Sequence, residues 1–442
     1  MVVLPYSFVT PPIDGSIPPA LAIDFHLKHN PDHAFAILHH AADSSQTTVT
    51  YEQLACAVHR VAHILNPDRA IPQGSNIGIL ISASSIEYIV LVLGAMRAGL
   101  VPFPISPRIH LSGLAHLLTT TQTPLLIAGG SDVIDSTTAQ LSELLDESSF
   151  SVNFINFSAL RDILSLTKSS ELLDESSFSV NFINFSALRD ILSLTKNSGV
   201  SFKSFPSLEP MKSDSIVTVL HSSGSTGMPK AIKYHLEGVF KNIVNQPIEW
   251  TFSEPNTIVG TMTLPTFHCM GLILQVLAPI YVGYTQLLFA PPRVPAMPSP
   301  TSTLEAIANV KCAYLICVPA FLEAWANDDR AKSVLKFMKG VIYGGGPLTD
   351  EIGNKLVNHG VRVYSGYGAT EFGTISILPP SDQSEDWPWN YIKFSPHVNP
   401  HFIPQNDQDN AFELVFEAGE DHDPFVLNSE IASAKKIGRQ LT

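Results

Sequence analysis

The sequence predicts an α/β fold with mostly parallel sheets, followed by a smaller β-rich subdomain. Three observations predict this class. Apolar runs of strand length alternate with helix-length amphipathic segments as far as Thr370. Beyond that residue, short apolar runs follow one another without helices between them. The chain has 442 residues, which is room for roughly two to four domains or subdomains.

A strand–helix–strand unit near the start of the chain implies a parallel sheet. Before it, Thr50 and Gln53 have the spacing of a capping box and open an amphipathic helix. The unit itself is expected to consist of a strand, a helix, the glycine after its last turn and a second strand: Ile77–Ile81, Ser85–Ala98, Gly99 and Leu100–Ile105.

The same alternation continues along the chain. Further strands are expected at Ile216–Leu220, Thr257–Met262, Gln286–Ala290, Ala313–Val318, Gly340–Tyr343 and Val361–Tyr364. Helices are expected at Leu236–Asn245, Thr303–Val310, Ala320–Asn327 and Thr349–His359. The last short strands are expected at Gly373–Leu378, Tyr391–Phe394 and Phe412–Glu417. We therefore divide the chain into an N-terminal extension (1–20), a large α/β domain (21–371), a partial β-rich subdomain (372–430) and an irregular tail (431–442).

Composition and charge exclude several classes of protein. The chain is 45% hydrophobic and 15% charged, so it is not disordered throughout. Its net charge of −14 repels phosphate backbones, which argues against nucleic acid as a partner. Four scattered cysteines argue against a disulfide scaffold and for a reducing compartment. The N-terminus lacks the basic region of a secretory signal, and polar breaks argue against a membrane span at Met270–Pro291, so we expect a cytoplasmic protein.

A perfect repeat interrupts the large domain. Residues Ser142–Lys168 recur without change as Ser170–Lys196, an offset of 28 residues. Structural repeats drift in sequence and need at least about three copies to bury a core, so a recent duplication or an error in assembling the coding sequence explains the pattern better. We expect the sheet to have one place for the strand in this segment, so that one copy packs and the other loops out.

The most informative stretch is His221–Lys230, which follows a strand and reads HSSGSTGMPK. Its glycines let the backbone approach an anion, its hydroxyls add donors, and Lys230 adds a charge that binds phosphate. It is not a Walker A loop, because its glycines are three apart and Ala231 follows the lysine. The alternative is a flexible Ser/Gly linker, which the strand-like flanks argue against.

This loop resembles the signature loop of the adenylate-forming (AMP-binding) superfamily, which includes acyl-CoA synthetases, peptide-synthetase adenylation domains and luciferases. Four further stretches resemble the family's motifs, in the family's order along the chain: Gly94–Pro104, Leu264–Gly271, Tyr343–Leu348 and Gly366–Glu371. The residue sequence of the loop and the stretch from Phe412 to Asn428 are most similar to those of fungal peptide-synthetase-like proteins and carboxylic acid reductases. The resemblance implies the large N-terminal domain of the adenylate-forming fold, with stacked αβαβα subdomains and a smaller, incomplete β-barrel-like subdomain.

The resemblance also implies an activity: a carboxylate and ATP form an acyl-adenylate and release pyrophosphate. It implies ATP/AMP and Mg²⁺ as cofactors. By motif, the β- and γ-phosphates would be held by Ser222, Ser223, Gly224, Ser225, Thr226, Gly227 and Lys230, and His221 at the start of the loop is a further candidate for nucleotide binding. The adenine would lie between Tyr367 and the backbone of the two nucleotide motifs: Gly344, Gly345, Gly346, Pro347, Gly366, Gly368 and Ala369. Thr370 would bind the α-phosphate, and Glu371, with Thr226, would ligate Mg²⁺.

Each of these residues also has a simpler interpretation. Glu371 alone would be a solvated carboxylate, Tyr367 a strand aromatic, and the glycines a turn. His268 alone would be a core histidine, but it lies in the segment that resembles the acyl-pocket motif. Amino-acid-activating members usually have an aspartate there, which pairs with the substrate ammonium, and Pro265–Met270 contains none. We therefore expect an aryl or aliphatic acid without an α-amino group.

Some family features are missing from these 442 residues. We find no Tyr-x-Thr-Gly-Asp motif after Glu430, no lid subdomain with its catalytic lysine, and no carrier or reductase motif. The thiol acceptor, CoA or a phosphopantetheinyl carrier, is therefore not encoded here. Two interpretations stay open. One is an adenylate-forming ligase, or its large domain, with activity impaired by the missing lid. The other is a truncated, catalytically weak nucleotide- or acyl-binding remnant.

Overall fold

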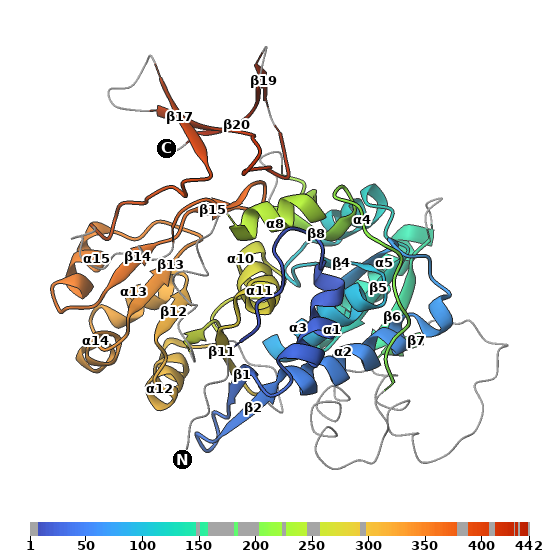
Figure 1. Ribbon diagram of the computed structural model, residues 1–442, viewed down its shortest axis with the longest axis horizontal. Helices are drawn as coiled ribbons and strands as arrows, with labels where there is room; N and C mark the ends of the chain where they lie inside the picture. The colour runs from blue at the N-terminus through green and yellow to red at the C-terminus, as the bar shows by residue number, and fades with distance from the viewer. Residues whose placement is uncertain are drawn as a thin grey trace.

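Two parallel sheets with buried faces form the body of the protein (Figure 1). The computed structural model describes residues 8–146, 151–157, 181–183, 203–222, 227–244, 257–291, 298–377, 388–405, 412–427, 429–431 and 434–440. The seven-stranded sheet has the order β14 (Val363–Ser365), β13 (Gly340–Tyr343), β12 (Tyr314–Cys317), β10 (Ile258–Gly260), β11 (Thr285–Phe289), β1 (Ala34–His39) and β2 (Gln46–Thr50). Only the β1–β2 pairing in it is antiparallel.

The second sheet is parallel throughout. Its order is β4 (Val101–Pro104), β3 (Asn76–Ile81), β5 (Leu125–Gly129), β6 (Asn153–Phe157) and β7 (Asn181–Ile183). Alternate side chains of each strand enter different cores: Ile77 and Ile79 pack in the central core, whereas Leu80 packs in an outer one. Because both faces are covered, the strands are nearly continuously apolar, which is the pattern that the sequence showed.

Helices complete five layers, as predicted. The central layer, between the sheets, contains α1 (Pro19–His29), α2 (Tyr51–Leu65), α3 (Ser85–Arg97), the π-helical η3 (Leu272–Leu277) and α11 (Ala278–Val282). The outer layer on the five-stranded sheet contains α4 (Leu111–Thr120) and α5 (Asp132–Asp146). The outer layer on the seven-stranded sheet contains α12 (Pro300–Val310), α13 (Pro319–Trp325), α14 (Asp329–Leu335) and α15 (Asp350–Val357).

The expected local signals at helix ends are present. The hydroxyl of Thr50 accepts from the backbone N–H of Gln53 at 3.3 Å, and the Gln53 side chain accepts from the Thr50 N–H at 3.0 Å, which completes the capping box. Gly99 follows α3 with φ +78°. Its N–H donates to Met96 and that of Leu100 to Ala95, which is the bond pattern of a glycine-terminated helix.

The expectation that only one copy of the repeat packs is wrong. Strand β6 comes from the first copy and β7 from the second, and they pair in parallel with Ile155 opposite Asn181. An edge strand of a parallel sheet offers free N–H and C=O groups to a further strand, so the sheet accepts the same sequence twice. The segments 158–180 and 184–202 lie outside the described residues.

The region after Thr370 is β-rich, but its elements differ from the prediction. An open antiparallel sheet has the order β17 (Asn399–Pro404), β18 (Phe412–Glu417), β20 (Ala434–Gln440) and β19 (Ser429–Ile431) and stands at the edge of the body (Figure 1). The predicted irregular tail is therefore wrong over β20, which the sheet orders by pairing with β18. Tyr391–Phe394 is not a strand: Phe394 forms one isolated bridge to Ser376, and prolines at 388 and 396 flank the segment.

The apolar stretch Met270–Pro291 folds into helical turns and a strand. It contains the end of α10 (Cys269–Gly271), then η3, α11 and β11. Across the described part of the chain, no helix has both the length and the apolar character needed to cross a membrane.

Candidate functional site

The predicted phosphate loop connects the two strands of a hairpin. Strand β8 (Ile216–Ser222) pairs antiparallel with β9 (Lys230–His235), and Ser222 lies opposite Lys230. Lys230 is exposed at the start of β9. Gly227 has φ +87° and open space where a side chain would begin, so a glycine suits this turn. Four predicted loop residues, Ser223, Gly224, Ser225 and Thr226, lie outside the described residues.

His221, at the end of β8, has a structural bond. Its Nε2 accepts a hydrogen bond from the backbone N–H of Ser106 at 3.0 Å, which assigns the proton of the neutral ring to Nδ1. Burial, and then the nearby charge of His268, lower the pKa of His221 to about 4. The structure thus places His221 near His268, which belongs to a different motif. The Nε2 of His221 is already hydrogen-bonded to Ser106.

The two nucleotide motifs meet the pocket motif at Gly344. This residue follows β13, and a side chain there would lie 3.1 Å from the carbonyl oxygen of Gly366 and 3.3 Å from the sulfur of Met270. Gly366 also donates its N–H to the carbonyl oxygen of Tyr343 at 2.7 Å. Gly345 has φ +83° and no atom near its missing side chain. Three segments that the sequence singled out separately therefore form one surface.

The exposed side of this surface contains three of the predicted nucleotide-site residues. Gly345, Gly346 and Pro347 are exposed, and the space beside Gly345 and Gly346 is largely open. Gly368 was expected to let the backbone approach a flat base. A side chain there would lie 2.4 Å from the carbonyl oxygen of Gly373, so the hairpin itself also requires this glycine, and its approach to a base stays a prediction.

Thr370 and Glu371 form the turn between β15 (Gly368–Ala369) and β16 (Gly373–Thr374). Thr370 is buried and Glu371 is half-buried. Tyr367, just before the turn, is half-buried: its N–H donates to the hydroxyl of Ser376 at 2.8 Å, and its ring packs near Phe372. The turn is thus held by its own hairpin, with the Glu371 carboxylate at its end.

Glu371 faces the pocket motif. Burial raises the pKa of the Cys269 thiol to about 11, and the charge of Glu371 contributes to this rise. His268, beside Cys269, is solvent-accessible, yet the protein atoms around its ring lower its pKa, so the imidazole is neutral at pH 7. The carboxylate of Glu371 is therefore near enough to the pocket motif for its charge to act on Cys269, the residue next to His268.

Two residues at this site, Tyr234 and Phe425, were missed by the sequence reasoning. The Tyr234 hydroxyl lies 2.8 Å from the carbonyl oxygen of Thr370 and 3.1 Å from the sulfur of Cys269, and Phe425 stacks on the Tyr234 ring. The buried alternation of Ile232 and Tyr234 along β9 was a usable signal for the tyrosine. Phe425 lies in a segment without regular secondary structure, and no sequence pattern marked it.

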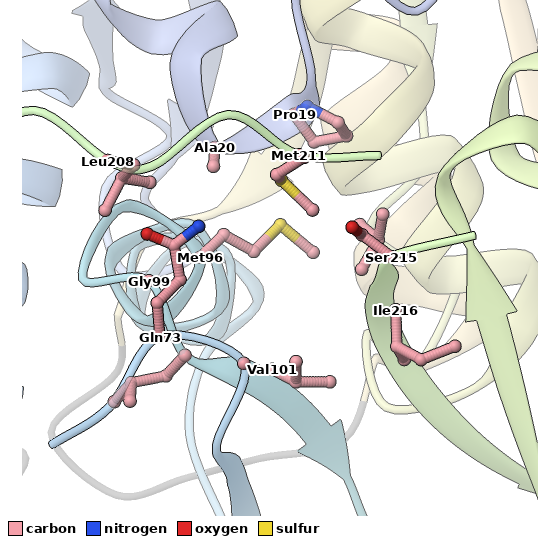
Figure 2. Close-up of a pocket in the computed structure, with 13 residues that line it drawn as sticks. Pro19, Ala20, Gln73, Met96, Gly99, Val101, Leu208, Met211, Ser215 and Ile216 are labelled. Atoms are coloured by element: carbon pink, nitrogen blue, oxygen red, sulfur yellow. The ribbon is translucent and has the colours of Figure 1, made fainter. Parts of the chain in front are cut away.

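A cavity of about 240 Å³ lies elsewhere, near the N-terminal end of β8 (Figure 2). Met96 and Met211 point toward one another across it, and Pro19 and Val101 are among its other lining residues. The seven residues of β8 separate it from the loop, a span of about 20 Å at the rise of a strand. None of the predicted site residues lines it.

Comparisons with known proteins agree with the fold and the motifs. The sequence profile of the family described as "AMP-binding enzyme" matches residues 24–395. Adenylate-forming reductase Nps11 of Serpula lacrymans is 31% identical over 412 residues, which cover 91% of this chain and 35% of that protein. The chain thus spans about a third of the length of this curated relative.

Solved structures show the same fold. An acyl-CoA synthetase of Brucella canis superposes with a TM-score of 0.69 at 16% identity, covering 95% of this chain and 72% of that one. ATP-bound MatB of Rhodopseudomonas palustris superposes with a TM-score of 0.64 at 18% identity, covering 91% and 71%. The relatives include fungal adenylate-forming reductases and peptide-synthetase-like enzymes, as the motif wording predicted. The chain belongs to the AMP-binding enzyme family.

Proposed function

We propose that this chain activates a carboxylic acid with ATP, forming an acyl-adenylate and pyrophosphate, as the adenylation part of a synthetase- or reductase-like enzyme. The observation that carries the proposal is the meeting of Gly344, Gly366 and Met270, because it joins two nucleotide motifs to the pocket motif. The family membership and the ATP-bound neighbour support ATP as the nucleotide.

The proposed chemistry is an in-line substitution at phosphorus. A carboxylate oxygen attacks the α-phosphorus, a new P–O bond forms, and the bond to the β-phosphate oxygen breaks, so pyrophosphate leaves with its electrons. Catalysis of this kind depends on positioning and on charge neutralisation. Lys230 would neutralise the β- and γ-phosphates with the loop residues Ser222 to Gly227, and Thr370 would bind the α-phosphate.

The metal site that the family implies fits the residues present. Glu371 offers carboxylate oxygen, the ligand type that Mg²⁺ prefers, at the end of a turn next to the proposed α-phosphate position. The second proposed ligand, Thr226, lies outside the described residues. A magnesium ion held there would offset phosphate charge during the reaction.

The proposed substrate is an aryl or aliphatic acid without an α-amino group. His268 occupies the pocket motif, and its lowered pKa makes it a neutral partner that gives an ammonium group no counter-charge. The acid's acceptor after activation would be a thiol, either CoA or a carrier arm, which these residues do not contain.

The test is carboxylate-dependent ATP–pyrophosphate exchange with a panel of aryl, aliphatic and α-amino acids. We expect exchange with a simple acid and little with amino acids. Lys230→Ala should lower the exchange rate by about 10²–10³, the usual effect of removing one well-placed charge. Lys233→Ala, an exposed lysine on the same strand, is the matched control and should leave the rate within about twofold.

Each other outcome has a definite meaning. Robust exchange with amino acids alone would refute the substrate class. Absence of exchange from a folded chain that still binds ATP would refute the enzymatic proposal in favour of a nucleotide-binding remnant. Equal losses of exchange rate in Lys230→Ala and Lys233→Ala would contradict the assignment of Lys230 to the phosphate site.

A further inference from the structure

Tyr234 connects three motifs that lie far apart in the sequence. It is fully buried on β9, four residues after Lys230. Its hydroxyl lies 2.8 Å from the carbonyl oxygen of Thr370, which is 136 residues away, and 3.1 Å from the sulfur of Cys269. The phosphate-loop strand, the pocket motif and the second nucleotide motif therefore share one hydrogen-bonding group.

The direction of these bonds follows from the donors available. A carbonyl oxygen only accepts, so the Tyr234 hydroxyl donates to Thr370. The thiol of Cys269, whose pKa burial raises to about 11, keeps its proton and donates to the Tyr234 oxygen. The result is a chain from Cys269 through Tyr234 to the backbone of the Thr370–Glu371 turn.

A second bond holds the other half of this turn. The backbone N–H of Val426 donates to the carbonyl oxygen of Glu371 at 3.1 Å. The adjacent Phe425 stacks on Tyr234 with ring centroids 3.6 Å apart and planes 8° apart. Consecutive carbonyls, those of Thr370 and Glu371, are thus fixed from two sides by Tyr234 and by the segment that stacks on it.

The docking of Phe425 has its own supports. A side chain at Gly238, on α8 (Leu236–Val244), would lie 2.7 Å from the Phe425 ring, so only glycine leaves room for it. His235 Nδ1 accepts from the Gly238 N–H at 3.1 Å, which leaves Nε2 protonated beside Asp423 at 3.4 Å. The segment 423–426 therefore packs against β9 and α8 through a ring stack and a polar contact between His235 and Asp423.

We propose that Tyr234 is a positioning residue for the reaction, held flat by Phe425, and that it sets the Thr370–Glu371 turn from which the α-phosphate and the metal ion are bound. This inference rests on the proposed function for its catalytic part. Its structural part concerns the turn itself and is measurable without turnover. Phe425 gives the C-terminal β region a role in the site of the α/β body.

The central variant is Tyr234→Phe, which removes the hydroxyl and keeps the stacked ring. The matched control is Tyr281→Phe, because Tyr281 is equally buried and donates to the Ile17 carbonyl at 2.7 Å, outside the motif residues. Tyr234→Phe loses the bonds to Thr370 and Cys269, and Tyr281→Phe loses the bond to Ile17, so both melting temperatures should fall, that of Tyr234→Phe further.

Three measurements separate positioning from general stability. Amide hydrogen exchange of residues 366–377 should accelerate about tenfold in Tyr234→Phe and not in Tyr281→Phe. Calorimetric binding of Mg·ATP should weaken about tenfold only in Tyr234→Phe. In pyrophosphate exchange, the half-saturating Mg²⁺ concentration should rise only in that variant. Phe425→Leu, which removes the stacked ring, should give smaller changes of the same kind. Phe425→Tyr, which keeps the ring, should behave like the wild type.

The outcomes distinguish the two proposals. No exchange by the wild-type chain, with faster amide exchange in Tyr234→Phe, would defeat the proposed function and leave the positioning of the turn supported. Equal amide exchange of residues 366–377 in Tyr234→Phe, Tyr281→Phe and wild type would overturn the positioning proposal whatever the chain's activity. Equal effects of the two variants on Mg·ATP binding would reduce Tyr234 to a structural role and overturn it as well.

Discussion

The α/β body and the C-terminal β region are built on different principles. Strands β12 and β13 of the body are buried along their whole length, with each face in a separate core. In the C-terminal sheet, β17 is exposed or half-buried at every position, and Phe402 is 56% exposed. The body therefore carries large cores, whereas the described part of the C-terminal region has a small one around Val398, Leu414 and Phe416.

The attachment consists of a few aromatic anchors. Trp389 is buried in the outer core beside α15, where a side chain at Gly353 would overlap its ring, and it donates to Asn354 at 2.9 Å. Phe425 packs on Tyr234. A region with little core of its own thus supplies residues that complete the body, including one at the candidate site.

The largest effect on this comparison is expected from removing an anchor. Trp389→Ala should lower the free energy of unfolding by about 3–5 kcal/mol, because it opens a large cavity in the outer core of the body. Phe402→Ala, at an exposed aromatic of the same region, should change it by about 0.5 kcal/mol or less. Urea denaturation of both variants measures the difference. Equal losses of unfolding free energy in the two variants would mean that the exposed Phe402 stabilises the protein as much as the buried Trp389, which would contradict the comparison.

A second prediction concerns histidines in the two regions. His26, in α1 of the body, is fully buried; its Nε2–H donates to the Ile280 carbonyl at 2.6 Å, and its Nδ1 accepts from Asn30 at 2.8 Å. Burial lowers the pKa of His26 from 6.5 to about 4. The unfolded chain therefore binds a proton between these values that the folded chain does not bind. Stability from this group is complete above pH 6.5 and is lost as the pH falls towards 4.

Lowering the pH from 7 to 5 should therefore cost about 2 kcal/mol through His26. In His26→Gln this part of the pH dependence should disappear. The control is His401→Gln in the C-terminal sheet, where the histidine is 41% exposed and pairs with Glu417. The His401→Gln variant should show the same loss of stability between pH 7 and pH 5 as the wild-type chain. Chemical denaturation at the two pH values measures this, and an unchanged pH dependence in His26→Gln would contradict the assignment.

The smallest effect is expected from the repeat, at the edge of the body. Deleting Ser142–Ser169 joins Leu141 to an identical sequence, so the end of α5 and strand β6 can re-form from the second copy. Only the short edge strand β7 is lost. The melting temperature should fall by about 2 °C or less, since 1 kcal/mol corresponds to roughly 2–4 °C in a domain of 150–250 residues. A fall of several degrees would mean that both copies are needed for stability.

The repeat and the tail show where local reasoning fails. The sequence of each copy predicts a strand, and both copies provide one, but whether a sheet edge has room for the second depends on the neighbouring strand. Likewise 434–440 is polar and reads as irregular, yet pairing with β18 makes it a strand. Edge pairing is decided by the partner, because the hydrogen-bonding groups belong to the backbone and not to the sequence pattern.

The candidate site shows the same division. The glycines at 344, 345 and 366 were singled out from the sequence, because they lie in stretches that resemble the family's nucleotide motifs. Tyr234 was not identified, because a buried tyrosine on a strand looks like any other core aromatic until its partner is known. The assignments of Lys230, Thr370 and Glu371 stay predictions, and four residues of the phosphate loop lie outside the described structure.

The sequence by itself determined the alternation of strands and helices in the α/β body, its helix caps and the order of its motifs, because periodicity and capping act over a few residues. The five-layer arrangement was expected from the family resemblance. Only the tertiary structure decided that Cys269, Tyr234, Thr370 and Phe425 meet, and that Gly368 serves its hairpin. These contacts join segments up to 136 residues apart in one hydrogen bond. They follow from how the β8–β9 hairpin, the body and the C-terminal segment pack together, which no local pattern of residues specifies.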